Sequence, residues 1–117
     1  MKVFVYFNLH KKVFSVKALE GPMKGRVVAH RPSVHLINAE FRVSQAGRAR
    51  VIAEQRKNVH AGVVGQWDDT LPAQYAGVAV TYNPYRFESF VRKSDEKPVH
   101  RAHNAYLYDR KILANIA

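Results

Sequence analysis

Apolar residues recur at every second position over much of the chain, and this spacing predicts strands rather than helices. Residues 3–9 carry apolar side chains at both parities, including Phe4 and Tyr6, which is typical of a strand inside a sheet. The same spacing resumes over 13–19, after the polar segment 10–12. We therefore expect the chain to begin with a hairpin that has a basic tip.

The segment 34–43 shows the most regular alternation in the sequence. One parity is apolar apart from a histidine, and we expect it to face the core: His35, Ile37, Ala39, Phe41 and Val43. The other parity carries an amide and two charges: Asn38, Glu40 and Arg42. A further strand is predicted over 59–67, and we expect the ring of Trp67, like that of His35, to face the interior.

A short helix is predicted between these two strands. Ser44 is a suitable N-cap, the helix runs from Gln45 to about Lys57, and Asn58 suits its end. Since Arg56 then falls in the last turn with Lys57, the helix dipole favours both charges. The buried side is expected to be weak: Ala46, Ala49, Ile52 and Ala53.

The tail, residues 103–117, fits two structures. Apolar residues spaced three or four apart after Asn104 would line one face of a helix. Alternatively, the run 106–108, a turn at 109–110 and the run 111–113 form a final hairpin, which we favour because aromatic residues prefer strands.

The remaining segments complete a strand-rich domain. Turns are expected at 20–25 and 83–84, where glycine or asparagine adjoins proline, and a loop at 68–77. Further strands are expected at 26–30, 78–82, 87–93 and 98–102, the last two forming a hairpin around 94–97. The predicted fold is a single α+β domain over residues 1–117, with mostly antiparallel strands and one short central helix.

The charge of the chain points to a polyanionic partner. Lysine and arginine number 19 against 9 aspartate and glutamate residues, a formal net charge of +10. Residues 1–62 hold 12 basic and 3 acidic side chains, whereas residues 63–117 hold 7 and 6. Such an excess destabilises the compact state by self-repulsion, and a phosphate backbone is the commonest partner that compensates it.

Missing residue types and missing sequence patterns exclude several classes of protein. The chain has no cysteine, so disulfides, iron–sulfur clusters and thiol catalysis are ruled out. No apolar run approaches the roughly 20 residues of a membrane span, and the N-terminus lacks the features of a signal peptide, so we expect a cytoplasmic protein. The six histidines lack the spacing of a metal motif, and we expect neither a metal nor another cofactor.

We expect the partner to be nucleic acid, with RNA slightly favoured over DNA. Lysine and arginine bind phosphates, and nearby rings such as Tyr6 and His30 can stack on unpaired bases. The predicted contact residues lie on hairpin tips, turns, the helix and the helix–strand junction: Lys11, Lys12, Lys24, Arg26, Arg31, Arg48, Arg56, Lys57, Asn58 and His60.

A small metal-independent ribonuclease is an alternative. Its chemistry needs a general base, a general acid and a cation to stabilise the charge of the transition state. His60, Lys57 and Tyr82 could supply these groups, with Arg56 or Tyr85 in supporting positions. Nothing in the sequence fixes an acid and a base at a catalytic distance, so we lean against an enzyme.

Four segments resemble those of small basic proteins encoded by tailed bacteriophages: Tyr6–Lys12, Phe14–Val16, Gly25–His30 and Arg56–Gly62. The resemblance covers roughly residues 1–67 and assigns no activity and no functional residue. It implies a role in the bacterial cytoplasm during infection, such as host takeover, with host RNA or ribosomes as targets. A third function is then an inhibitor that binds an acidic surface of a host protein. An exposed strand edge could also pair two copies, so a homodimer is allowed.

Overall fold

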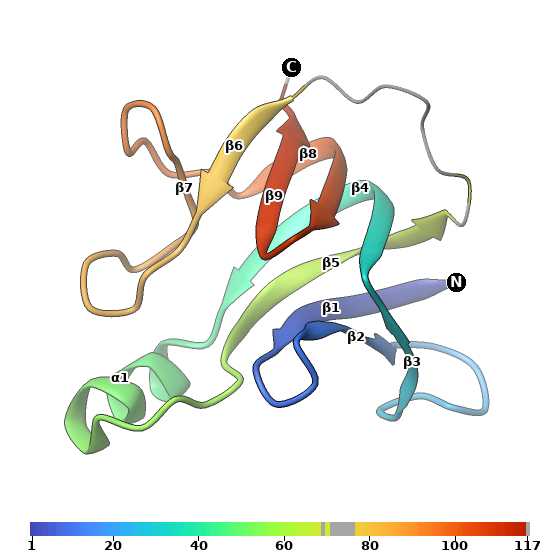
Figure 1. Ribbon diagram of the computed structural model, residues 1–117, viewed down its shortest axis with the longest axis horizontal. Helices are drawn as coiled ribbons and strands as arrows, with labels where there is room; N and C mark the ends of the chain where they lie inside the picture. Colours follow the sequence, from blue (N-terminus) through green and yellow to red (C-terminus); the bar gives the residue numbers. More distant parts are fainter. Residues whose placement is uncertain (69, 71–76, 117) are drawn as a thin grey trace.

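The computed structural model describes residues 1–68, 70 and 77–116, which form one antiparallel sheet and a single short helix (Figure 1). The elements are β1 (Lys2–Asn8), β2 (Val13–Ala18), β3 (Val27–Arg31), β4 (Ser33–Val43), α1 (Gln45–Glu54), β5 (Ala61–Asp68), β6 (Val78–Thr81), β7 (Val91–Arg92), β8 (Arg101–Tyr108) and β9 (Lys111–Asn115). Strands dominate, in the order β3-β2-β1-β5-β4-β8-β9-β6-β7. No helix within these ranges has the length and apolarity needed to cross a bilayer.

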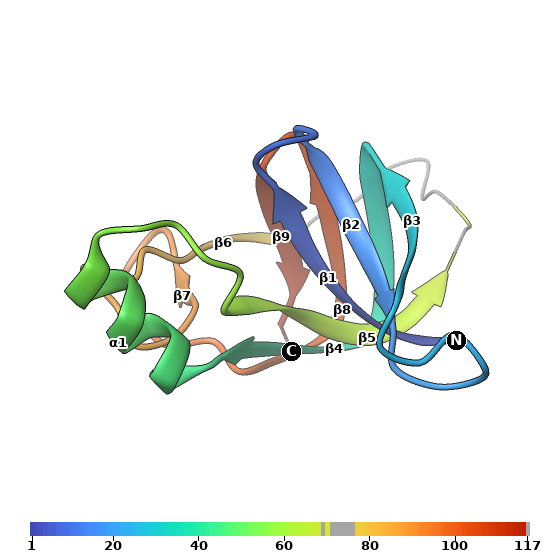
Figure 2. The same ribbon diagram turned by 90° about the horizontal axis from the view of Figure 1, so that it is seen from below.

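The sheet is strongly curved, and its concave side holds the core. Viewed from below, β1, β2 and β3 lie on the near side, with β8 and β9 behind them (Figure 2). Val5 and Val16 from the near strands and Leu107 from β8 belong to one buried cluster. The turn after β8 closes over β1, because the Arg110 guanidinium lies 4.9 Å from the centre of the Phe7 ring. One continuous core therefore joins both halves of the chain.

A bulge in β4 changes which residues of this strand face the core. Between Ile37 and Glu40, β4 has one residue more than the facing segment of β5, and Asn38 adopts a left-handed conformation with φ of 53°. Before the bulge Leu36 is fully buried and Ile37 is 39% exposed, whereas after it Phe41 is buried. The prediction that Ile37 shares the core face with Phe41 is therefore wrong, since the extra residue reverses the alternation.

His35 and Trp67 have the structural roles that the sequence predicts, with one difference in position. His35 is buried, but on the side of β4 opposite Leu36, where its Nδ1 lies 3.6 Å from Asp68 Oδ2. The Trp67 ring is half-buried and packs against the core. Its centre lies 5.5 Å from the guanidinium carbon of Arg31. The ring is thus covered on one side by the core and contacted by a cation.

The helix begins as predicted but is shorter and packs differently. The Ser44 side chain accepts a hydrogen bond from the Gly47 amide, as an N-cap should. The helix ends at Glu54 because Gln55 takes a left-handed conformation, so Asn58 is not its end. Pairing of β5 with both β1 and β4 overrides the local preference for a longer helix, since the chain must straighten to enter that strand.

The buried residues of the helix are Gly47 and Val51. A Cβ atom at Gly47 would come 2.5 Å from His60 Cβ, so only glycine allows this close approach. The side predicted to be buried is exposed instead: Ala46, Ala49, Ile52 and Ala53. The prediction failed because backbone proximity at a glycine, and not an apolar stripe, places the helix.

Most of the other predicted strands and turns are confirmed with small shifts, but the predicted strand at 87–93 is reduced to the two residues of β7. The tail forms the hairpin of β8 and β9, and Asp109 and Arg110 have the positive φ values that a two-residue turn requires. Residues around 94–97 form a tight turn, with a bridge between Val91 and Pro98, but the second arm continues into β8 and pairs with β4. Most of the predicted loop at 68–77 lies outside the described residues.

Candidate nucleic-acid interface

The tip of the first hairpin is fixed by an asparagine and presents two lysines. The Asn8 side-chain oxygen accepts hydrogen bonds of 3.0 Å from the amides of His10 and Lys11. The Lys12 amide donates to the Asn8 carbonyl at 2.7 Å, and Lys12 has a left-handed φ of 58°. The side chains of Lys11 and Lys12 are exposed. The predicted basic tip therefore exists, and three hydrogen bonds to Asn8 stabilise its backbone.

The connection between β2 and β3 presents a second basic pair. Gly21 and Gly25 have φ values of 78° and 86°, which glycine adopts without strain. The Gly25 amide donates to the Ala18 carbonyl at 2.8 Å and closes the turn. Lys24 and Arg26 are exposed on either side of Gly25. This turn thus holds two cations outside the sheet.

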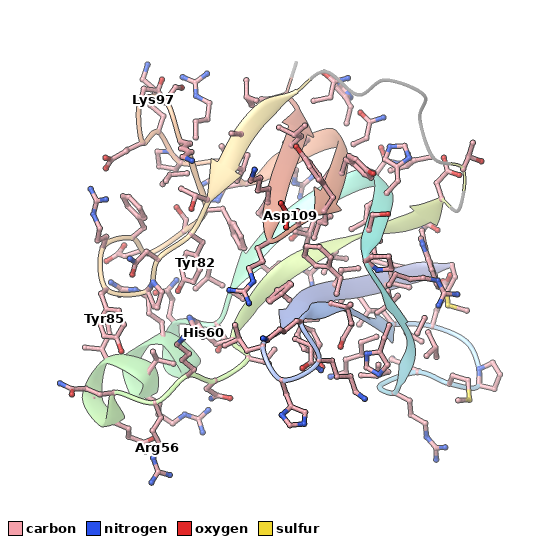
Figure 3. All side chains as sticks on the ribbon, in the orientation of Figure 1. Arg56, His60, Tyr82, Tyr85, Lys97 and Asp109 are labelled. Atoms are coloured by element: carbon pink, nitrogen blue, oxygen red, sulfur yellow. The ribbon has the colours of Figure 1, made fainter. Side chains whose placement is uncertain are left out.

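The connection from α1 to β5 carries Arg56 and Lys57, both exposed. Because the helix ends at Glu54, neither residue belongs to its last turn, and the prediction that the dipole favours their charge is wrong. The Arg56 side chain points away from His60 and Tyr82 (Figure 3). These cations are therefore available to solvent and are not part of the pair that His60 forms.

We name these three segments the basic connections, defined by Lys11, Lys12, Lys24, Arg26, Arg56 and Lys57. In Figure 1 all three lie along the lower edge of the molecule, and Figure 2 shows them spaced around β1, β2 and β3. Among the described residues, ion pairs join Arg42 to Glu40, Arg86 to Glu96 and Arg92 to Asp95, and none involves a basic connection. The positive charge there is thus not neutralised by carboxylates within the described chain.

The outer face of the first three strands lies between the basic connections. We define it by Phe4, Tyr6, Ser15, Lys17 and His30, which alternate with core residues along β1, β2 and β3. Ser15 is buried in this face, where its hydroxyl lies 3.1 Å from the Asn8 side-chain nitrogen and 3.0 Å from His30 Nδ1. The strand pattern identified Tyr6 and His30 as neighbours of the cations but gave no reason to single out Phe4.

His60 and Tyr82, two of the three residues predicted for a ribonuclease, are in direct contact. His60 Nε2 lies 2.7 Å from the Tyr82 hydroxyl, and Nδ1 lies 2.8 Å from the Asn58 carbonyl oxygen (Figure 3). A carbonyl oxygen only accepts, so Nδ1 carries a proton, and in the neutral ring Nε2 accepts from the Tyr82 hydroxyl. Both ring nitrogens are therefore already engaged by the protein.

The surroundings of Tyr82 keep its hydroxyl protonated. Burial raises the pKa of the Tyr82 phenol, and the positive charge of Arg48 opposes this shift. Arg48 in turn ties α1 to the connection after β6, since its Nε donates to the carbonyls of Pro84 and Phe87 at 3.0 and 2.9 Å. Arg48 thus holds the scaffold, and we omit it from the basic connections.

We expect Tyr82 to titrate above the usual range of tyrosine. Spectrophotometric titration of the protein should show one phenol that ionises above pH 10 and is missing in Tyr82→Phe. Because the folded-state pKa is raised, the stabilisation that the hydroxyl gives is complete below pH 10 and is lost as the pH rises through the raised value. Below pH 10, Tyr82→Phe should cost about 0.5–1.5 kcal/mol in free energy of unfolding. Equal stability of both proteins at neutral pH would contradict this hydrogen bond.

The other residues predicted for catalysis are not brought to this pair. In the described chain, neither Lys57 nor a second histidine is a hydrogen-bond partner of His60 or Tyr82. Tyr85 is 58% exposed on the connection after β6. No group of three or more histidine and acidic residues suited to a metal ion occurs among the described residues.

Comparison with known proteins gives a family and a phage relative. A family model described as Mycobacterium phage L5 gene 82 protein matches residues 1–115. The Gene 82 protein of Mycobacterium phage L5 is 42% identical over 120 residues, which cover 97% of this chain and 95% of that protein. No solved structure gives a significant match. The predicted resemblance to phage proteins is confirmed, and it extends from residues 1–67 to nearly the whole chain.

Proposed function

The chain belongs to the family of the Mycobacterium phage L5 gene 82 protein, and on this premise we propose that it binds nucleic acid, RNA ahead of DNA, in the bacterial cytoplasm during infection. The observation that carries the proposal is the set of exposed cations on the basic connections. These cations are spaced around β1, β2 and β3, and they have no carboxylate partner among the described residues. A regular array of phosphates is the ligand that such an arrangement attracts most strongly.

The scaffold of this surface supports a binder more directly than an enzyme. Asn8 holds the tip of the first hairpin, and two glycines shape the next turn, so the cations stand on ordered backbone. A fixed backbone limits the entropy lost on binding to that of the side chains themselves. We place RNA ahead of DNA because exposed and half-buried rings accompany the charges, and protein recognition of RNA is directed mostly at unpaired bases in loops and ends.

Fluorescence anisotropy with labelled RNA over a range of salt concentrations tests the proposal. We expect log affinity to fall with log salt with a slope of several negative units, because each phosphate contact releases counterions. A flat salt response, or no binding at low salt, would rule out the proposal. Affinity purification from host lysate, with and without nuclease treatment, adds a second readout. A host protein that is still recovered after nuclease treatment would favour the alternative function, an inhibitor that binds an acidic surface of a host protein.

The ribonuclease alternative retains one supporting observation, the hydrogen bond between His60 and Tyr82. If the pair were catalytic, cleavage of RNA would survive EDTA, and His60→Ala would lower its rate by about 10²–10⁴ while leaving affinity nearly unchanged. Because both His60 nitrogens are engaged, we expect the RNA to stay intact with both proteins. Metal-independent cleavage that His60→Ala abolishes would replace our proposal with the enzymatic one.

A further inference from the structure

We propose that the outer face of β1, β2 and β3 is a stacking platform for single-stranded nucleic acid, with Phe4 and Tyr6 as the rings that take successive unpaired bases. This inference rests on the proposed function and narrows its ligand to single strands. The two residues lie two apart on β1, and their ring centres are 6.0 Å apart with an angle of 37° between the ring planes. Both rings are half-buried.

A glycine in the neighbouring strand sets the position of the Phe4 ring. A Cβ atom at Gly62 in β5 would come 2.5 Å from Phe4 Cζ and 2.7 Å from Cε2. The ring therefore lies over bare backbone, in space that any other residue at position 62 would fill. Beside it, Val64 is 2% exposed although it points away from the core, because it is the cross-strand partner of Phe4 and of Glu40. The Phe4 ring therefore packs against the backbone of β5 at Gly62, beside the buried Val64 side chain.

No described element covers this face. In Figure 2 the outer side of β1 and β2 is turned to the viewer, and α1, the helix that would cover a sheet in a two-layer fold, stands at the end of the sheet instead. The helix is buried only at Gly47 and Val51, and its side-chain hydrogen bonds from Gln45 and Arg48 go to the connection after β6, away from this face. No described helix or strand therefore lies over the two half-buried rings, whereas Ser15 and Val64 beside them are buried by their neighbours on the same face.

The charges around the rings identify the occupant. Lys2 and Lys17 flank Phe4 on the same face, Lys2 two residues away on β1 and Lys17 directly opposite on β2. His30 adds a third planar ring at the edge of this face, and its Nδ1 lies 3.0 Å from the Ser15 hydroxyl oxygen. Flat rings with cations at their margins suit planar bases linked by phosphates, whereas an acidic protein surface would gain nothing from the ring faces.

Duplex nucleic acid does not fit this arrangement, because its bases are stacked on one another and show only their edges to a protein. The basic connections can still hold its phosphates. Stacking and charge therefore make separable contributions: the rings act on single strands alone, and the cations act on both forms.

The test compares binding of oligouridylate, oligothymidylate and a duplex of the same length. We expect the double variant Phe4→Leu/Tyr6→Leu to lose about 5- to 150-fold in single-strand affinity for each ring removed, with duplex affinity and the salt slope unchanged. Tyr6→Phe keeps the ring and should bind as the unchanged protein does. Tyr108→Leu on β8 is the matched control for loss of a half-buried tyrosine and should also bind normally. The ratio of uridylate to thymidylate affinity shows whether RNA or DNA is the source of the single strand.

A second measurement avoids dependence on the folding of the leucine variants. Irradiation of the unchanged protein with 5-iodouridine-substituted RNA should cross-link Phe4 or Tyr6, as mapped on peptides by mass spectrometry. Cross-links only elsewhere, or equal losses for single strands and duplex in a folded double variant, would overturn the platform while leaving nucleic-acid binding intact. Absence of binding to all three probes at low salt would instead overturn the proposed function.

Discussion

Replacing Lys11 and Lys12 together by alanine is expected to weaken RNA binding roughly 60-fold in low salt. Both side chains are exposed at the tip of the first hairpin, and neither pairs with a carboxylate among the described residues. Two lost phosphate contacts lower the salt slope for a single strand by about 1.4. We take the two proteins to bind equally at high salt, where phosphate contacts contribute little. At a salt concentration roughly 20-fold lower, the variant then binds about 60-fold more weakly. Anisotropy titrations at several salt concentrations measure both quantities.

The matched control is Lys93→Ala/Lys97→Ala, which removes the same charge from the turn after β7. Both lysines are exposed, and Lys97 lies at the opposite end of the molecule from Arg56 (Figure 3). We expect this variant to keep most of its affinity, because the charge it removes lies far from the basic connections. Equal losses in both variants would show that net charge alone drives binding and that no localised interface exists. The fold should be unaffected in either case, since backbone hydrogen bonds hold both turns, from the His10 and Lys11 amides to Asn8 and from the Glu96 amide to the Arg92 carbonyl.

Local patterns were sufficient to predict the strands because each one depends on neighbours in sequence. The hairpin of β1 and β2, the Ser44 cap and the tail hairpin all follow from alternation, capping chemistry and turn residues within a few positions. The helix end could not be predicted in this way. Gln55 leaves the helix because β5 must pair with two distant strands, and a long-range requirement of that kind has no local signal.

The candidate interface shows the same division. The sequence identified the cations of the basic connections, since turns place charged side chains outside a sheet. It also named both His60 and Tyr82, but their hydrogen bond depends on β6 returning beside the helix, which no spacing predicts. Phe4 was overlooked because strand alternation does not show which apolar face is left uncovered. A glycine at position 62 was the available signal, since glycine inside a strand marks a close approach.

The β4 bulge leads to the largest stability effect that we expect. Leu36 is fully buried between β5 and β8, whereas its neighbour Ile37 is 39% exposed. Leu36→Ala should therefore lower the free energy of unfolding by about 3–5 kcal/mol, because it removes apolar contacts and leaves a cavity in the core. Ile37→Ala removes a side chain of similar size, and we expect it to cost about 1 kcal/mol or less. Urea denaturation followed by circular dichroism measures both values.

These two neighbours distinguish the structure from simple alternation along the strand. Uninterrupted alternation places Ile37 with Phe41 in the core and makes Ile37→Ala the costly change, whereas the extra residue at Asn38 reverses this order. Deleting Asn38 should remove the bulge against β5 and leave Leu36 and Phe41 on the same face, while it shifts the register of the residues after Ile37 against β8 by one. A larger loss for Ile37→Ala than for Leu36→Ala would contradict the bulge, and with it the burial of His35 on the side of β4 opposite Leu36.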